Sequence, residues 1–429
     1  MKTLLTNALI IPMKTEGESL RGDIGIDGPH ISFIGEKPDT FVPDTTIDAS
    51  TMLAMPALVN AHTHLAMELM RNYKDTAPNL HAWLSEIFPI EDKLTAKDVL
   101  TSSRLGVIEL LQSGITLFND MYLFPESTAI AVNEAGIRAT LGLTLFGDLA
   151  SSKQRIRERE KLTDAAIAAS KGRIRLDIAP HAIYTCSKET YQYGHAWAHD
   201  NARQMHTHLS ETKKEVDDCL KEHGKTPLEY LESIGALQDL PTVLAHCVYL
   251  TESEIQMLKG MHISVAHNPS SNCKLASGIA PVATFFRNGI NVAIGCDGSS
   301  SNNNQNLFEE MHLSSLLSTV LTGDIAGLTP FQTLKMGTIN GAKALGMDKK
   351  IGTLEVGKEA DIILIDLNKA HLTPLNDPFS ALVYAAQASD VDTVFCQGNM
   401  VMHKRKVLGL DQELVQKEVE SCWQDIQGR

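Results

Sequence analysis

Short apolar runs rich in β-branched residues alternate with longer amphipathic stretches along most of the chain. Eight such runs lie between residues 55 and 298, and each is typical of a short buried strand. They are residues 55–64, 114–120, 139–147, 173–182, 202–211, 242–249, 262–269 and 291–298. Two of the helical stretches between them end at glycines expected to form C-caps, Gly114 and Gly136. Eight strands that alternate with helices predict an α/β fold, a (β/α)8 TIM-type barrel.

The two ends of the chain have a different pattern. Residues 1–54 and 350–429 are β-rich and hairpin-like, although they lie far apart in the sequence. Because the two segments are alike in character, we expect them to pair into one small sheet domain. The predicted organisation is therefore a composite domain of residues 1–54 and 350–429 and a barrel of residues 55–349.

The composition is typical of a globular protein, with 43% hydrophobic and 21% charged residues among 429. No run of 18 apolar residues occurs, so we expect no membrane partner. A net charge of −14 without a basic tract argues against nucleic acid and anionic membranes. Seven scattered cysteines, none in a C-x-x-C pair, indicate reduced thiols. With no recognisable leader segment, these features predict a cytoplasmic protein.

Polar side chains follow seven of the eight predicted strands at their carboxyl ends, where a barrel of this type forms its active-site face. His62 and His64 lie two residues apart and project to the same side of the first strand. His208 on the fifth strand and Asp297 after the eighth complete a set of three imidazoles and one carboxylate. Each residue alone fits a hydrogen-bonded side chain at a loop edge. Together they predict a site for one divalent metal, Zn²⁺ or Fe²⁺.

The motifs at the strand ends resemble those of the amidohydrolase superfamily. The resemblance is carried by HTH at 62–64, HLSE at 208–211, AHC at 245–247, HNP at 267–269, GCDG at 295–298 and IGTLEVGKEADIILID at 351–366. It implies that the two chain ends form an accessory β-sandwich beside a catalytic barrel. It also implies that His62, His64, His208 and Asp297 bind the metal and that an activated water attacks a substrate carbon.

Two positions refine the implied site. Dinuclear members of the superfamily usually place a carboxylated lysine at the end of the fourth strand, where this chain has His181. The resemblance therefore implies a single metal, with Zn²⁺ preferred, and leaves His181 free to contact substrate. His206 is an alternative ligand on the fifth strand, but the H-x-x-E spacing of the family selects His208 with Glu211.

Within the superfamily the chain is similar to deaminases of 5'-methylthioadenosine and S-adenosylhomocysteine, through HTHLAMELMRNY at 62–73, APHAIYTCS at 179–187 and CDGSSSNNN at 296–304. The similarity implies hydrolytic loss of ammonia from an adenine ring. Asp297 would take the proton of the attacking water, Glu211 would protonate a ring nitrogen, and His246 would bond the water. The alternative for Glu211 is a solvated carboxylate that opens the following helix.

The same similarity implies contacts to a nucleoside. Trp83 would pack beside the substrate and Glu91 would accept bonds from ribose hydroxyls, although a loop staple and a surface acid are equally good interpretations. An arginine for a homocysteine carboxylate is expected after the third strand. Arg155 is the candidate we carry forward, but the sequence does not separate it from Arg157 and Arg159.

Rival functions remain at this stage. Aminohydrolases of guanine or pterin and chlorohydrolases of triazines share several of these motifs. A scaffold protein of this fold would lack some of the metal and catalytic residues, and all of them are present. The prediction is therefore an enzyme with a small-molecule nucleoside substrate, and the resemblance also points to a homo-oligomer.

Overall fold

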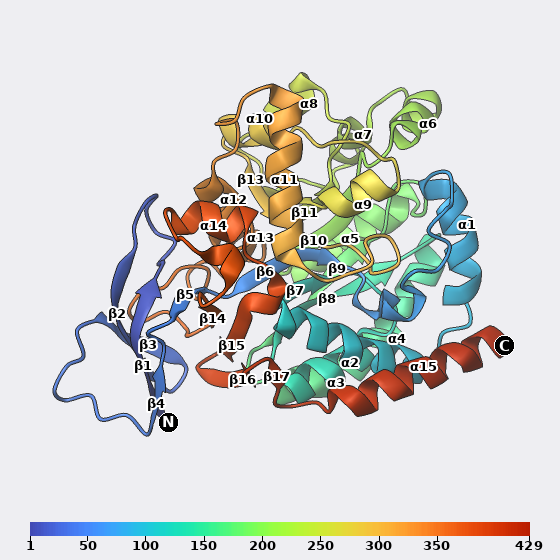
Figure 1. Ribbon diagram of the computed structural model, residues 1–429. Coiled ribbons are helices and arrows are strands. Elements are labelled where there is room, and N and C mark those ends of the chain that lie inside the picture. The colour runs from blue at the N-terminus through green and yellow to red at the C-terminus, as the bar shows by residue number, and fades with distance from the viewer.

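The computed structural model describes all residues 1–429, and its centre is a barrel of eight parallel strands (Figure 1). The strands pair in chain order and are β6 (Leu58–Thr63), β7 (Ile115–Asp120), β8 (Arg138–Leu145), β9 (Ile174–Pro180), β10 (Met205–Leu209), β11 (Thr242–His246), β12 (Ile263–His267) and β13 (Asn291–Ile294). Each lies within or overlaps one of the eight predicted runs. A bridge between Thr63 and Asp297 brings the last strand back to the first. The predicted fold class is confirmed.

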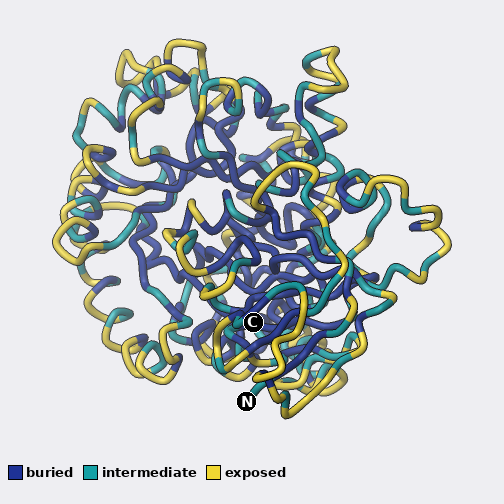
Figure 2. Tube along the Cα trace, turned by 90° about the vertical axis from the view of Figure 1, so that its left-hand side faces the viewer, coloured by how far each residue is buried: buried dark blue, intermediate teal, exposed yellow.

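Helices surround the barrel strands. They are α1 (Leu80–Glu91), α2 (Ala96–Gln112), α3 (Pro125–Ala135), α4 (Leu149–Ala169), α5 (Lys188–Asp200), α6 (Lys213–His223), α7 (Pro227–Ser233), α8 (Glu252–Met257), α9 (Pro269–Lys274), α10 (Val282–Arg287), α11 (Leu307–Thr322), α12 (Pro330–Met336), α13 (Ile339–Ala344), α14 (Pro378–Tyr384) and α15 (Gln412–Gly428). Gly136 caps α3 with a φ of 75°, as predicted, and Gly114 follows α2 with a φ of 80°. The buried residues concentrate in the interior and the exposed ones at the rim (Figure 2).

Strands from both chain ends form one separate nine-stranded sheet. Its members are β1 (Lys2–Ile10), β2 (Leu20–Asp27), β3 (His30–Gly35), β4 (Thr45–Asp48), β5 (Met52–Pro56), β14 (Ile362–Asp366), β15 (Val391–Cys396), β16 (Asn399–His403) and β17 (Lys406–Val407). The two ends meet where β5 pairs antiparallel with β14. Met55 and Pro56, which the sequence analysis included in the first barrel strand, pair with β14 instead. The chain therefore passes from the chain-end sheet into the barrel at Ala57.

Residues 412–428 form a helix where the sequence analysis expected β structure. The buried and half-buried side chains of α15 recur at helical spacing, with Val415, Val419, Cys422 and Ile426 on one face. This face packs along α2, so α15 belongs to the surroundings of the barrel rather than to the chain-end sheet. None of the helices combines the length and the apolar character needed to span a bilayer. All seven cysteines are free thiols.

A buried ion pair joins the chain-end sheet to the barrel. Arg138, the first residue of β8, donates from Nε and Nη2 to the two carboxylate oxygens of Asp361, each at 2.9 Å. Glu359 also contacts the guanidinium. Asp361 receives a further bond from the Gln397 backbone at 2.8 Å. Since Arg138 is only 1% exposed, this junction lies in a dry environment at the amino end of the strands, opposite the predicted active-site face.

Replacing Arg138 by Met should remove the cation and leave Asp361 buried without its partner. We expect the free energy of unfolding to fall by about 3–5 kcal/mol, measured by urea denaturation. Arg104→Ala is the control, because it breaks the partly exposed pair with Glu134 and should cost below ~1 kcal/mol. Equal effects of the two substitutions would contradict a structural role for the Arg138 pair.

Candidate metal and active site

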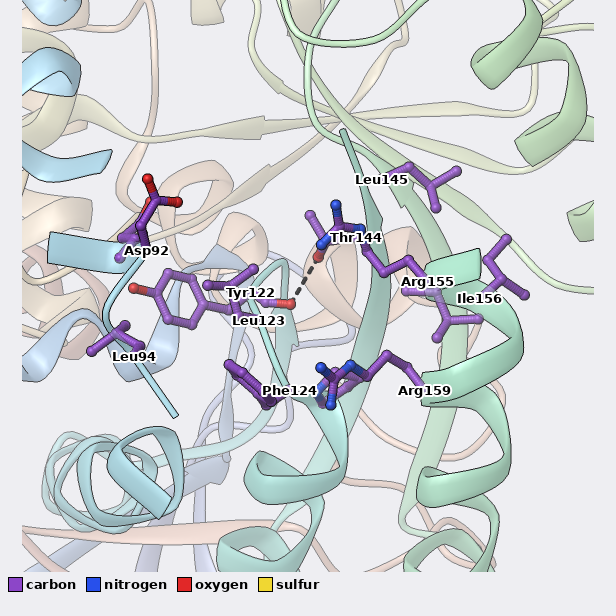
Figure 3. A pocket seen from close by; sticks show the side chains of 13 residues that line it. Asp92, Leu94, Tyr122, Leu123, Phe124, Thr144, Leu145, Arg155, Ile156 and Arg159 are labelled. Carbon is purple, nitrogen blue, oxygen red and sulfur yellow. Dashed lines mark hydrogen bonds between the residues drawn. The ribbon is translucent and has the colours of Figure 1, made fainter. Parts of the chain in front are cut away.

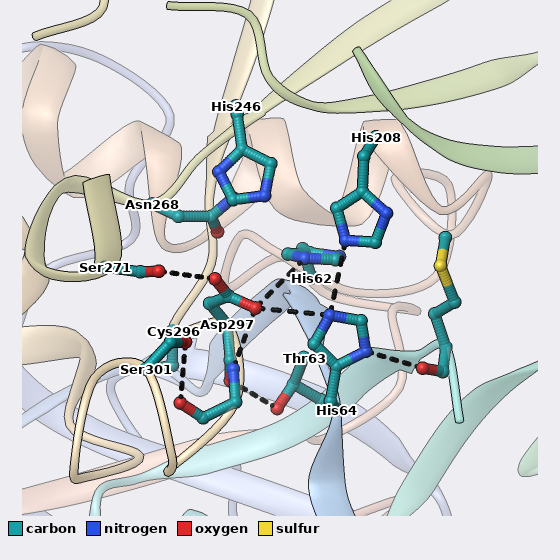
Figure 4. A network of polar contacts seen from close by, with 12 residues as sticks. His62, Thr63, His64, His208, His246, Asn268, Ser271, Cys296, Asp297 and Ser301 are labelled. Carbon is teal, nitrogen blue, oxygen red and sulfur yellow. Dashed lines mark hydrogen bonds and ion pairs between the residues drawn. The ribbon is translucent and has the colours of Figure 1, made fainter. Parts of the chain in front are cut away.

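Four predicted ligands converge at the carboxyl end of the barrel (Figure 4). His62 lies on strand β6 and His64 directly follows it, His208 lies on β10, and Asp297 follows β13. All four side chains are buried. Asp297 has a φ of 60°, a left-handed conformation that is unfavourable for a non-glycine residue and is a feature of functional sites. Two bonds hold it there, from its own N–H to His62 O at 3.0 Å and from Thr63 Oγ1 to its carbonyl at 2.9 Å.

The distances within the cluster bring ring nitrogens and a carboxylate to one point. Asp297 Oδ1 lies 3.4 Å from His62 Nε2 and 3.2 Å from His64 Nε2. The Nε2 atoms of His64 and His208 are 3.2 Å apart. Two groups have ligand atoms all within 4.8 Å of one another: His62, His64 and Asp297, and His62, His208 and His246. This arrangement could hold a metal ion.

The outer nitrogens of two rings are bonded to the backbone. His64 Nδ1 lies 2.5 Å from Met121 O, and His208 Nδ1 lies 2.8 Å from His181 O. A carbonyl accepts a bond only from N–H, so each Nδ1 carries a proton and each Nε2 points into the cluster, where it can coordinate in the neutral form of the ring. His62 Nε2 is buried without any hydrogen-bond partner. An unpaired buried nitrogen is costly, and a metal ion would satisfy it. The residues present therefore fit a bound metal.

Within the cluster, burial favours neutral rings at His62 and His208, whereas Asp297 is ionised and His64 holds a proton in the metal-free protein. Burial lowers the pKa of His62 to about 4, so its ring is neutral at pH 7 and able to coordinate. Burial also opposes protonation of His64, but hydrogen bonding and charge attraction from Asp297 outweigh it and raise the pKa to about 9. The same histidines hold the pKa of Asp297 well below its ordinary value despite burial. The Asp297 carboxylate is thus ionised and attracts a cation.

The structure separates the two histidines of β10. His206 Nε2 lies 2.8 Å from His62 Nδ1, on the side of that ring away from Asp297, and His206 belongs to neither ligand group. His208 faces His64 and His62 directly. His206 therefore lies one pleat deeper and supports His62. His208, which motif spacing selects over His206, therefore lies next to the other three candidate ligands.

Glu211 and His246 lie next to the cluster. Glu211 follows β10 and is only 3% exposed, so the alternative of a solvated carboxylate is wrong. Its Oε2 lies 3.8 Å from His246 Nε2, and its Oε1 accepts a bond from Ser277 at 3.2 Å. Burial raises the pKa of Glu211, and the negative charge of Asp297 adds to the effect. Both causes favour a protonated carboxyl that can donate a proton.

Three supporting residues were missed by the sequence analysis. Ser271 donates to Asp297 Oδ2 at 2.5 Å, and Asn272 Oδ1 lies 2.8 Å from His246 Nδ1. Both lie on the short helix α9. Glu215 accepts the backbone N–H groups of Ser210 and Glu211 at 2.9 and 2.8 Å. The signals that could have found them are the polar NPSSN segment at 268–272 and the acid at the third position of α6. His267 is buried outside the cluster.

A cavity opens beside the cluster and contains the predicted substrate contacts. Trp83 and Glu91 line it from α1, and His181 lines it from the end of β9, together with Glu211 and His246. Further apolar side chains complete the wall, namely Leu80, Leu84, Phe88, Tyr122, Phe146 and Leu275. Trp83 is buried, and Glu91 is half-buried with a pKa raised by burial. Neither is a simple surface residue, and both face the same cavity.

A second cavity of about 220 Å³ adjoins the first (Figure 3). The two share Glu91, Tyr122 and Leu123 as lining residues. Arg155 and Arg159 line the second cavity, whereas Arg157 is exposed and lies outside it. Arg159 is paired with Glu126 at 2.5 Å.

Arg155 stands apart from its two neighbours because it has no ion-pair partner. Its Nε is buried without a hydrogen bond, and its guanidinium lies 5.4 Å from the centroid of the Phe146 ring. Burial, followed by repulsion from Arg159, lowers its pKa. An unpaired cation in this position favours an anionic ligand group.

Comparison with known proteins points to one family. The profile of the amidohydrolase family matches residues 53–401. The chain is 45% identical to a 5-methylthioadenosine/S-adenosylhomocysteine deaminase of Thermoanaerobacter pseudethanolicus over 98% of both chains. It is 44% identical to a 5'-deoxyadenosine deaminase of Methanosphaera stadtmanae over 86% of both. A crystal structure of an adenosine deaminase from Xanthomonas campestris with bound zinc has a TM-score of 0.94 and 30% identity, covering 100% of this chain and 99% of that one.

Glu215 should make the stability of the metal-free protein depend on pH. Burial, with a smaller contribution from the charge of Glu211, raises its pKa from the ordinary 4.5 to about 7. A raised pKa means that the folded state binds the proton more tightly, so this stabilisation is complete below about 4.5 and is lost as pH rises through about 7. The stability advantage of the wild type over Glu215→Gln should therefore decrease by roughly 3 kcal/mol from pH 4.5 to 8.

Urea denaturation of chelator-treated wild type and Glu215→Gln across that pH range measures this difference. Because both proteins share every other titratable group, the contributions of groups that do not interact with Glu215 cancel. A difference that does not change with pH would contradict the raised pKa of Glu215.

Proposed function

The chain belongs to the amidohydrolase family and is a hydrolase acting on C–N bonds, and from this premise we propose that it deaminates the adenine ring of adenosines with a modified 5' group. The proposed substrates are 5'-methylthioadenosine, S-adenosylhomocysteine and related adenosines. The products are ammonia and the corresponding inosine analogue. The observation that carries the proposal is the buried cluster of three imidazoles and Asp297 beside Glu211, a carboxyl whose environment favours its protonated form.

His62, His64, His208 and Asp297 are the proposed ligands of one divalent ion, with zinc preferred over iron. The proposal is supported by the unpartnered Nε2 of His62 and by the Nδ1 bonds that turn the Nε2 atoms of His64 and His208 inward. Imidazole nitrogens and a carboxylate oxygen are donor types that both zinc and iron accept. Such an ion, when bound, activates water as a nucleophile at neutral pH.

The chain's own groups would move the protons. Asp297 accepts a proton from the attacking water, and the neutral carboxyl of Glu211 protonates the ring nitrogen next to the amino-bearing carbon. Protonation makes this carbon electrophilic, so the hydroxyl adds to it. The proton on Asp297 then passes to the departing amine, which leaves as ammonia. The remaining hydroxyl proton returns to Glu211, and a carbonyl forms where the amine had been. His246 Nε2 would orient the water before the attack.

The cavities supply contacts for the rest of a nucleoside. We assign His181 to the purine ring, Glu91 to the ribose hydroxyls and Trp83 to the apolar surface beside the sugar. A carboxylate that accepts bonds from two vicinal hydroxyls fixes the sugar, and therefore the reacting carbon, relative to the cluster.

Arg155 would bind the carboxylate of S-adenosylhomocysteine in the second cavity. Its unpartnered guanidinium supports this role, and the shared wall at Glu91 and Tyr122 gives a 5' substituent a path into that cavity. Arg157 is exposed outside the cavity and Arg159 already pairs with Glu126, so neither offers an unpaired cation there. A cytoplasmic location and a homo-oligomeric state remain further parts of the proposal.

A substrate screen tests the function. Ammonia release and the ultraviolet change from adenine to hypoxanthine are followed for methylthioadenosine, S-adenosylhomocysteine, adenosine, guanine and a chlorotriazine. We expect turnover of the two thio-nucleosides well above the others. Turnover confined to guanine or triazine would favour the alternative, a hydrolase of another N-heterocycle.

Arg155→Ala should lower kcat/KM for S-adenosylhomocysteine by about 10- to 100-fold, because a charged hydrogen bond is lost, and leave kcat/KM for methylthioadenosine nearly unchanged.

Two substitutions separate metal binding from proton transfer. Glu211→Gln should retain zinc and lose methylthioadenosine deamination by a factor of at least about 100, because the amide cannot supply the proton. His208→Ala should lose both zinc and activity. Metal analysis of the purified variants, together with kcat, distinguishes the cases. Substantial activity in Glu211→Gln would remove this residue from the proton-transfer step.

A further inference from the structure

Helix α1 forms one wall of the proposed nucleoside cavity but is not part of the repeating barrel. It lies in the long connection between β6 and α2, at the edge of the molecule (Figure 1). Its inner face contributes Leu80, Trp83, Leu84, Phe88 and Glu91 to the cavity wall. The position of this wall therefore depends on what holds α1 from outside.

An apolar cluster connects α1 to helix α15, which lies more than 300 residues later in the chain. The cluster contains pocket-lining side chains of α1, including Trp83 and Leu84, and also the fully buried Ile426 of α15. Val419, Cys422 and Trp423 pack against the same cluster. One face of α15 is thus continuous with the outer side of the cavity wall.

Specific contacts from α15 reach both flanks of α1. Before α1, the rings of Tyr73 and Trp423 meet edge to face with centroids 5.3 Å apart. After α1, Arg429 donates from Nη1 to Lys93 O at 3.0 Å and to Asp98 Oδ2 at 2.7 Å. Lys93 lies two residues beyond Glu91, the proposed ribose contact. The two contacts therefore hold the segments before and after α1 to the same helix.

We propose that α15, through Trp423 and Arg429, positions α1 and thereby sets the affinity of the site for the sugar and 5' portion of the substrate. The inference rests on the proposed nucleoside function for its kinetic consequence. Trp423 and Arg429 are positioning residues, since neither lines either cavity. The metal cluster is held by barrel strands and by α9, so α15 affects binding of the substrate rather than the chemical step.

The kinetic test compares Trp423→Ala and Arg429→Ala, singly and combined, with the wild type. In the double variant we expect KM for methylthioadenosine to rise about tenfold, with kcat within about twofold and zinc content unchanged. Trp423→Phe should recover most of the affinity because it retains an aromatic contact with Tyr73. Glu420→Ala, on the exposed side of α15, is the matched control and should behave as the wild type. An unchanged KM, or a loss confined to kcat, would overturn the inference.

Hydrogen exchange in the substrate-free protein tests the positioning role without reference to any substrate. The double variant should exchange the amides of residues 80–91 faster, while those of the barrel strands keep their protection. Unaltered exchange at 80–91 would overturn the inference whatever the enzyme deaminates. Faster exchange in a protein that deaminates no adenosine would support the role of α15 and refute the proposed function.

Discussion

The closure of the barrel and the assembly of the candidate metal site depend on the same hydrogen bonds. Asp297 bonds to His62 through its backbone and receives the hydroxyl of Thr63, and this bridge brings the end of β13 to the end of β6. The carboxylate of Asp297 and the imidazoles of His62 and His64 therefore meet because the last strand returns to the first. Asp297 adopts a left-handed φ of 60° at this junction, together with both backbone contacts and the approach of its carboxylate to the ring nitrogens.

Around this junction, backbone and buried polar groups fix the orientation of each functional side chain. Carbonyl oxygens at the ends of β7 and β9 bond the outer nitrogens of His64 and His208, while Ser271 bonds Asp297. Glu215 holds the backbone at Glu211. Buried groups that are held by such bonds have little freedom to reorganise, which is the condition for electrostatic stabilisation of a transition state. The same dryness raises the pKa of Glu211 and makes a neutral proton donor available.

The sequence predicts those features that follow from periodicity. The eight strands can be recognised in the sequence because each is a short run of buried residues, and the polar residues at their ends can then be located. The sequence therefore predicts that His62, His64 and Asp297 lie close together. Side chains two residues apart on one strand lie on the same side and differ only in how deep they lie in the barrel. Which of His206 and His208 reaches the cluster therefore depends on tertiary packing. Likewise, Arg159 has an ion-pair partner and Arg155 has none, because Glu126 lies next to Arg159 in the folded chain. The helix at 412–428 was missed because its neighbours are strands and its apolar face is narrow.

The buried ion pair, the candidate metal cluster and the proposed substrate contacts lie in different parts of this chain. The buried Arg138 pair joins the sheets at the amino end of the strands, whereas the metal cluster lies at the carboxyl end. The proposed contacts to the sugar and the 5' group come from α1 and α4, which lie outside the barrel strands that carry the cluster. Residues without shared contacts contribute almost additively to free energy. Changes in α1, α4 or the bracing helix α15 can therefore alter which 5' substituent is accepted while the imidazoles and Asp297 keep their geometry. The same cluster could in this way serve adenosines with neutral and with charged 5' groups.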